Sequence, residues 1–132
     1  MATSLITQNN LVSKILRGSS ALTTSFVETE TMNIQGANQV QLLISFIRGD
    51  SEGCRLKIEY SEDRVTWYQE SMVSEFPSLN EVEHGMITRK IEDAGNYVLS
   101  IPVSSSYIKV SAQAINSGDS TLLSIKAAAA NI

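Results

Sequence analysis

The sequence contains one cysteine, Cys54, and one histidine, His84, and these scarcities argue against most thiol and metal chemistry. A single cysteine cannot form a disulfide within the chain, so we expect a fold that does not depend on an oxidising compartment. Zinc sites draw three or four ligands from spaced positions, and one histidine flanked by Glu81 and Glu83 does not supply them. A cysteine nucleophile needs both a base and an orienting group. We therefore expect no metal, no cofactor and no enzymatic activity.

Runs of basic residues and long apolar runs are also missing. The net charge is −4 and the sequence pI is about 4.9, which disfavours contact with phosphate backbones, so we expect no nucleic-acid partner. No stretch approaches the roughly 20 apolar residues of a membrane span, so we expect no membrane partner. The first ten residues, MATSLITQNN, lack the basic and apolar segments of a secretory signal. We therefore expect a soluble protein that is made in the cytoplasm.

What the sequence does contain is typical of a small β domain. A chain of 132 residues is one domain by size, and 42% hydrophobic content is enough to form a core. Only 18% of the residues are charged, and Ser, Thr, Asn and Gln make up the difference. This composition favours strands and loops over exposed helices, which are rich in Glu, Lys, Arg and Ala.

The clearest local pattern is CRLKIEYSEDRVTWYQE, residues 54–70. Leu56, Ile58 and Tyr60 alternate with charged residues, and a side-chain period of two indicates a half-buried strand. The polar turn that follows predicts a hairpin, with Val65 and Trp67 returning along the same apolar side. Tyr68 would then face outward.

Similar patterns predict strands along most of the chain, over residues 21–28, 31–34, 40–47, 82–92, 97–103, 107–115 and 121–130. The last of these ends in four alanines, so propensity alone leaves strand and helix open. In 40–47, Leu43 and Ile47 lie opposite the inward residues, which indicates a strand that is covered on both sides or faces a partner. Eight or nine short strands without βαβ alternation predict an all-β fold, an antiparallel β-sandwich that is jelly-roll-like.

Residues 1–20 differ from the body of the chain, which we place at 21–132. Paired apolar residues, Leu5 and Ile6 and then Leu11 and Val12, are set among polar ones. The spacing fits either a short helix or an extended N-terminal arm that orders on a neighbouring subunit. An ordinary first strand or a helix packed on its own domain remains the alternative.

The run SEDRVTW, residues 61–67, resembles the S-x-D-G-x-x-W hairpin of small β-sandwich proteins from tailed-bacteriophage virions. Arg64 stands where that pattern has glycine, which predicts a less strained turn. The order of elements is similar too: an apolar strand precedes the hairpin, and the strand YIKVSA at 107–112 precedes a small turn and a final strand. The resemblance covers about residues 21–130 and brings no catalytic residues with it.

The resemblance implies a capsid decoration, or cement, protein in the virion, or a tail or neck accessory protein. Its partners would be the major capsid protein or other virion proteins, and we expect a homo-oligomer, with a trimer as the first hypothesis. The residues expected to make contacts are Leu5, Ile6, Leu11, Val12, Leu43, Ile47 and Tyr68. A carbohydrate-binding module is the competing hypothesis, because the exposed ring of Tyr68 would suit stacking on a sugar.

Overall fold

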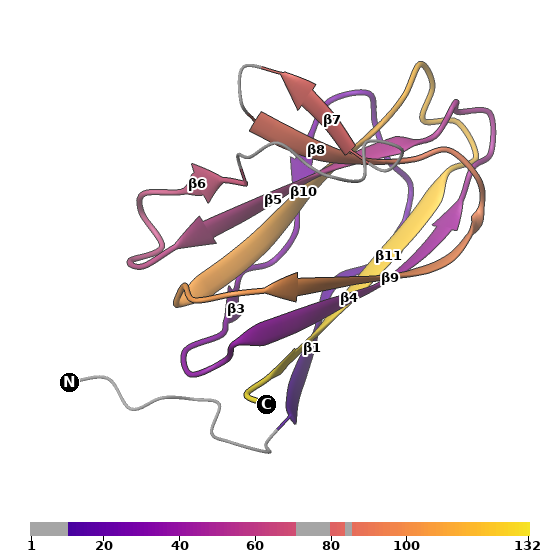
Figure 1. Ribbon diagram of the computed structural model, residues 1–132. Coiled ribbons are helices and arrows are strands. Elements are labelled where there is room, and N and C mark those ends of the chain that lie inside the picture. Colours follow the sequence, from indigo (N-terminus) through magenta and orange to yellow (C-terminus); the bar gives the residue numbers. More distant parts are fainter. Residues whose placement is uncertain (1–10, 71–79, 84–85) are drawn as a thin grey trace.

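The computed structural model describes residues 11–70, 80–83 and 86–132, and the regular structure in these residues is entirely β (Figure 1). The strands are β1 (Leu11–Ser20), β2 (Val27–Glu28), β3 (Met32–Asn33), β4 (Gln39–Ile47), β5 (Cys54–Ser61), β6 (Tyr68–Gln69), β7 (Asn80–Glu83), β8 (Met86–Ile91), β9 (Gly95–Pro102), β10 (Tyr107–Ala114) and β11 (Leu122–Ala130). The described residues form eleven strands and not the eight or nine expected, because the eleven include the two-residue strands β2, β3 and β6. The described residues contain no helix that is long and apolar enough to cross a membrane.

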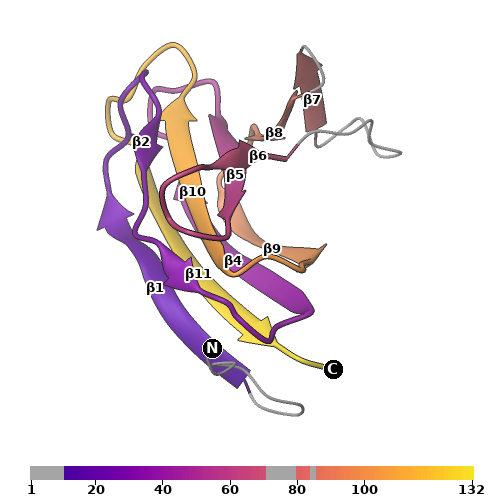
Figure 2. The same ribbon diagram turned by 90° about the vertical axis from the view of Figure 1, so that its left-hand side faces the viewer.

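Two antiparallel sheets form the layers of a sandwich (Figures 1 and 2). We call the sheet with the order β1-β11-β4-β9 the first sheet, and the sheet with the order β2-β10-β5-β8-β7 the second sheet. The short strands β3 and β6 pair with β10 and β5 at the margins of the second sheet. The predicted antiparallel β-sandwich is confirmed.

The topology is that of a jelly roll. Without the marginal strands β3, β6 and β7, eight strands remain in chain order. The first, eighth, third and sixth of these form the first sheet, and the second, seventh, fourth and fifth form the second. Most connections therefore cross from one sheet to the other, as in a double Greek key. This strand order confirms the predicted jelly-roll-like sandwich.

Alternating side chains from both sheets build the core. In β4 the inward residues are at most 2% exposed, whereas the residues between them face solvent. The second sheet contributes the inward residues of β5 and β10 to the same core. Each fully buried aliphatic or aromatic side chain stabilises the fold by about 1.5–3 kcal/mol relative to exposure. The main inward residues are Val40, Leu42, Ile44, Phe46, Leu56, Ile58, Ile108, Val110, Leu123 and Ile125.

The alanine-rich end of the chain is a strand and not a helix. β11 lies between β1 and β4 and pairs with both along most of its length. Ala127 and Ala129 are fully buried between the sheets. Backbone pairing on both sides outweighs the helix propensity of alanine, because tertiary context dominates strand formation.

Two expectations for the first 28 residues are wrong. Residues 11–20 are strand β1 of the first sheet, so the sandwich begins before residue 21 and this segment is not a helix (Figure 2). Only Val27–Glu28 of the strand expected at 21–28 is a strand. The residues before it cross between the sheets, where the Leu22 amide donates to the Thr121 hydroxyl. Residues 1–10 lie outside the described part, so the arm proposal for them stays a prediction.

The predicted hairpin at residues 54–70 is correct for its first strand and only partly correct for its second. Leu56 and Ile58 are buried, as expected. Val65 is 81% exposed, however, and β6 begins only at Tyr68. The turn is longer than the sequence indicates because the hydroxyl of Ser61 and the carboxylate of Asp63 accept hydrogen bonds from the backbone of residues 63–66.

Arg64 adopts the left-handed conformation, with φ of 64°, at the position where the phage hairpin pattern has glycine. This backbone costs a residue with a Cβ roughly 1–2 kcal/mol. The expectation of a less strained turn is therefore wrong. The hydrogen bonds that hold the turn also lower the pKa of Asp63, chiefly those donated by the amides of Thr66 and Val65.

Candidate functional site

The outer face of the first sheet is the candidate functional surface, and its main property is the absence of acidic residues. None of the 14 Asp and Glu residues of the chain lies in β1, β4, β9 or β11, which hold three of its ten Lys and Arg residues. The remainder of the chain, with seven basic and 14 acidic residues, carries all of the negative charge. We call this surface the acid-free face and define it by the outward residues of these four strands.

An apolar row crosses the acid-free face at mid-height. The strand register places Ile15 of β1, Leu43 of β4 and Val98 of β9 in one line, and these three residues are the apolar row. Lys126 of β11 lies in the same line, between Ile15 and Leu43. Ile15 is 60% exposed, Leu43 38% and Val98 57%. Depletion of charge combined with exposed apolar side chains distinguishes interface cores from the rest of a protein surface.

Two shallow hollows flank the apolar row. One, of about 320 Å³, lies between β4 and β9 beside Leu43 and Val98. The other, of about 250 Å³, lies between β1 and β4 and includes Ile15, Leu43 and Lys126 in its lining. The basic residues in their linings are Arg17 and Lys126, both in the second hollow. The face can therefore seat protruding side chains of another surface.

The structure brings together three of the residues expected to make contacts. Leu11, Leu43 and Ile47 all lie on the acid-free face, because the register gives them the same side of the sheet. Val12 lies on the opposite side of β1 and packs against the core, so it is not available for a partner. Tyr68 is 65% exposed but belongs to the margin of the second sheet. The two remaining residues, Leu5 and Ile6, fall outside the described part of the chain.

The sequence analysis missed Ile15, Val98 and Leu122 as members of this surface. Val98 could have been predicted, because its neighbours in the strand at 97–103 were expected to point inward and the period of two then turns Val98 outward. Ile15 was obscured by the helical interpretation of the N-terminal segment. Leu122 pairs with Ile47 across the sheet, and that pairing joins strands far apart in the sequence.

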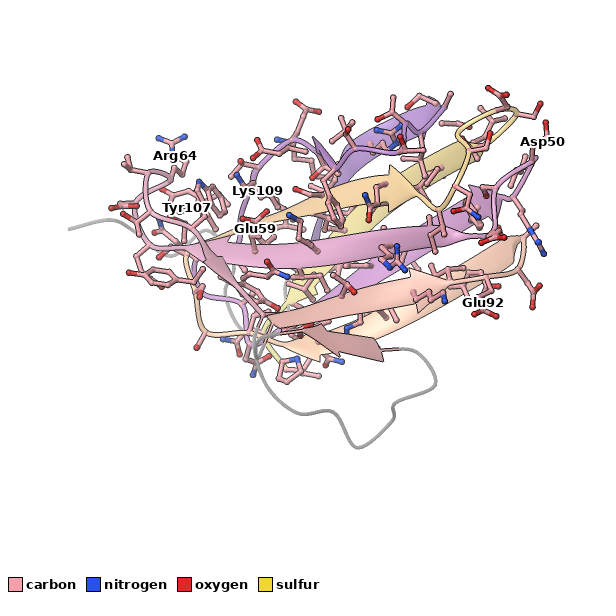
Figure 3. The ribbon with its side chains drawn as sticks, turned by 90° about the horizontal axis from the view of Figure 1, so that it is seen from above. Asp50, Glu59, Arg64, Glu92, Tyr107 and Lys109 are labelled. Carbon is pink, nitrogen blue, oxygen red and sulfur yellow. The ribbon has the colours of Figure 1, made fainter. Side chains whose placement is uncertain are left out.

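The outer face of the second sheet is charged instead. In Figure 3, which looks onto this face, Arg64, Tyr107, Lys109 and Glu59 gather toward one end, and Asp50 and Glu92 lie at the other. Lys109 is only 8% exposed, because the Glu28 carboxylate lies 2.8 Å from its ammonium group and the Trp67 ring covers it at 4.3 Å. These contacts satisfy the lysine within the fold.

Three aromatic rings on or beside this sheet, those of Phe26, Trp67 and Tyr107, each have a cation over one face, whereas Tyr68 is exposed. Trp67 was expected on the apolar side of the hairpin with Val65, but it lies half-buried over Lys109 on the outer face. The Tyr107 ring is covered by Arg64, with the guanidinium carbon 5.2 Å from the ring centre. Phe26 likewise has the Lys57 ammonium 4.0 Å from its ring centre. One face of each of these rings is thus already used by a cation.

A groove of about 360 Å³ at one end of the sandwich contains Tyr60, Glu70 and Arg89. Burial and the nearby charge of Glu70 raise the pKa of Tyr60 to about 12, against an opposing effect of Arg89. The Arg89 guanidinium donates two hydrogen bonds to the Glu70 carboxylate, at 3.2 and 3.0 Å. Since the acid and the guanidinium satisfy each other, the groove offers no poised acid or base.

One serine motif also lacks a catalytic geometry. Residues 49–53, GDSEG, match the G-x-S-x-G pattern of hydrolases. That pattern requires a strand-to-helix turn that exposes the serine hydroxyl, whereas this turn joins strands β4 and β5. Ser51 is 2% exposed, and its hydroxyl donates to the Arg48 carbonyl at 2.7 Å. The serine therefore stabilises the turn.

Cys54 is expected to resist alkylation in the native protein. Its side chain is fully buried, and burial raises the pKa of the thiol to about 12, so almost no thiolate forms near neutral pH. Iodoacetamide at mildly alkaline pH should leave the folded protein unmodified and should label it fully in denaturant, as measured by intact mass. Rapid labelling of the folded protein would show that this strand opens readily.

Metal binding finds no support in the described residues, where no group of three or more His, Cys, Asp and Glu side chains comes close enough to hold an ion. His84, the sole histidine, lies outside them.

No protein-family model matches the sequence, and neither does any curated protein. Among solved structures, the SPBc2 prophage-derived protein YomS superposes with a TM-score of 0.58 at 10% identity, covering 91% of this chain and 92% of YomS. The PBSX exported protein XepA superposes with a TM-score of 0.62 at 16% identity over 92% of this chain, which spans 37% of XepA. A GH115 4-O-methyl-α-glucuronidase aligns with a TM-score of only 0.43 over 18% of its length. The likeness to YomS and XepA shows a shared fold.

Proposed function

We propose that this chain is a non-enzymatic structural protein of a bacteriophage virion, and specifically a decoration protein that stabilises the head by bridging neighbouring capsid subunits. The observation that carries the proposal is the acid-free face, an extended β surface with exposed apolar residues on an otherwise acidic chain. YomS, which shares the fold over nearly all of this chain, is by name a prophage-derived protein, and this likeness, together with that to the PBSX exported protein XepA, supports a phage origin.

The proposed mechanism is adhesion and not chemistry. A rigid jelly roll presents its acid-free face to the capsid, and each copy buries a modest apolar area with few ion pairs. A protein that binds only the assembled, expanded form of a shell stabilises that form by mass action. Many copies on one head then add their contributions.

Purified protein should bind emptied or expanded phage heads and raise the temperature at which they rupture. Sedimentation of the heads with bound protein measures the first effect, and a thermal release assay for packaged DNA measures the second. Heads that bind no protein would remove the decoration role. Immunogold labelling of intact virions separates the alternatives: gold on the head supports decoration, whereas gold on the tail or neck supports an accessory protein there.

A further inference from the structure

The four open edges of the two sheets differ in how well they are protected against strand addition. An edge strand presents unpaired N–H and C=O groups, and natural proteins protect such edges with charges, bulges, short strands or covering loops. β1 is protected in several ways: it carries Lys14 and Arg17, and its register with β11 shifts twice. In addition, the Glu30 amide donates to the Leu16 carbonyl.

The edges of the second sheet are short and charged. β2 has two residues and ends in Glu28. β7 has four residues, of which Glu81 and Glu83 are acidic. Neither edge suits the addition of another strand.

Among the described residues, the edge of β9 has no charge, no bulge and no paired strand to protect it, and its one protective residue is Pro102 at its end. The strand is eight residues long and pairs with β4 through eight consecutive positions without a bulge. No charged residue occurs from 95 to 108. Val98, near its middle, is 57% exposed. Among the described strands, β9 pairs with β4 alone.

The hydrogen-bond pattern shows which groups of β9 point to the open edge. The Val103 amide donates to the Asn38 carbonyl and continues the β4 ladder. Backbone directions alternate along an antiparallel strand, so the odd-numbered residues turn their N–H and C=O groups toward β4. Asn96, Val98 and Ser100 therefore turn theirs to the open edge. Pro102 falls in the same series, where its missing N–H costs no bond to β4.

We propose that β9 pairs with β9 of a second copy of this chain, antiparallel about a two-fold axis at Val98. Val98 then lies opposite the same residue of the other copy, and Asn96 lies opposite Ser100. Each of these residues can both donate and accept a backbone hydrogen bond, so the edge is self-complementary. The two first sheets become one continuous sheet, and the two acid-free faces become one surface.

A second copy suits this edge because neither partner brings a charge to it, although each chain has a net charge of −4. The half-buried Tyr97 and Leu99, which pack at the rim of the core, would face each other across the axis and lose their remaining contact with water. A two-fold contact of this kind closes on itself and does not propagate into fibres. The proposal predicts a dimer in place of the trimer first expected. It does not depend on the proposed role in the virion.

The test is the oligomeric state of the full chain, measured by sedimentation equilibrium for the wild type and two lysine variants. The wild type should be a dimer. Val98→Lys places two like charges opposite each other at the axis and should raise the dimer Kd by about 100-fold. Gln41→Lys puts the same charge on the same outer face, on the central strand β4, and should leave the dimer intact. Circular dichroism should show that both variants are folded.

A second pair of measurements isolates the backbone bonds. Ser100→Pro removes an N–H that points only to the open edge, so it should weaken the dimer while leaving the fold intact. Hydrogen exchange should show the amides of Asn96, Val98 and Ser100 protected in the wild type and exchanging rapidly in Val98→Lys. A wild-type monomer or trimer, a Val98→Lys dimer of unchanged Kd, or rapid exchange of these amides in the wild type would each overturn the proposal, as would pairing of this edge with a strand of another protein.

Discussion

Replacing Phe46 with alanine is expected to destabilise the protein by about 3–5 kcal/mol, a large part of the stability of a typical small domain. Phe46 is 1% exposed and lies on β4 between Leu123 of β11 and Gly95 of β9 in the strand register. Its ring fills the space between the two sheets, so truncation loses apolar burial and leaves a cavity. Urea denaturation followed by circular dichroism measures the free energy of unfolding.

The adjacent residue provides the matched control. Ile47 is 52% exposed on the opposite side of the same strand. Ile47→Ala should therefore cost less than about 1 kcal/mol, in the range of surface substitutions. Equal costs for Phe46→Ala and Ile47→Ala would mean that β4 does not have one buried side and one open side, which contradicts the sandwich.

A single carboxylate in the acid-free face is expected to abolish binding to phage heads. Leu43 is 38% exposed at the centre of the apolar row, so Leu43→Glu should fold normally. Binding would bury this carboxylate against a surface that is complementary to an apolar side chain. Lys126 lies opposite this position in the strand register, but we expect the cost of taking the new ion pair out of water to exceed its Coulombic gain. We therefore expect about a 100-fold loss of affinity in the head-binding assay.

Val65→Glu is the control for this variant because it makes the same change in charge at an exposed aliphatic residue in a turn of the second sheet, away from the acid-free face. Val65 is 81% exposed in the turn before β6. This variant should bind heads as the wild type does. If Val65→Glu abolished binding and Leu43→Glu did not, the capsid-facing surface would be the second sheet and the acid-free face would have another role.

The sequence predicts the fold class well because a sandwich imposes a simple rule on its strands. Each strand with one buried side must alternate, and the burial of residues 40–47 does so without exception. In residues 107–114 apolar and polar residues alternate in the sequence, although 108–112 are all buried. The N-terminal strand was predicted only as an alternative to an arm or a short helix, because its apolar residues fall in pairs. Only its pairing with β11 decides that Leu16 is buried and Ile15 exposed.

The candidate surface was predictable only in part, since it depends on which strands become neighbours. The outward direction of Leu43 and Ile47 follows from the period of two within one strand. The apolar row, by contrast, brings Ile15, Leu43 and Val98 together from separate parts of the chain, with Lys126 of a fourth strand between Ile15 and Leu43. The lack of acidic residues is visible in the sequence of each strand, but it becomes a surface only when these strands share a sheet.

A cryo-electron-microscopy reconstruction of phage heads saturated with this protein tests the central proposal most directly. We predict density for the jelly roll on the outer surface of the shell, with β1, β11, β4 and β9 facing the capsid subunits and the charged second sheet facing solvent. Heads without added density, or copies seated through the second sheet, would contradict the proposed role of the acid-free face.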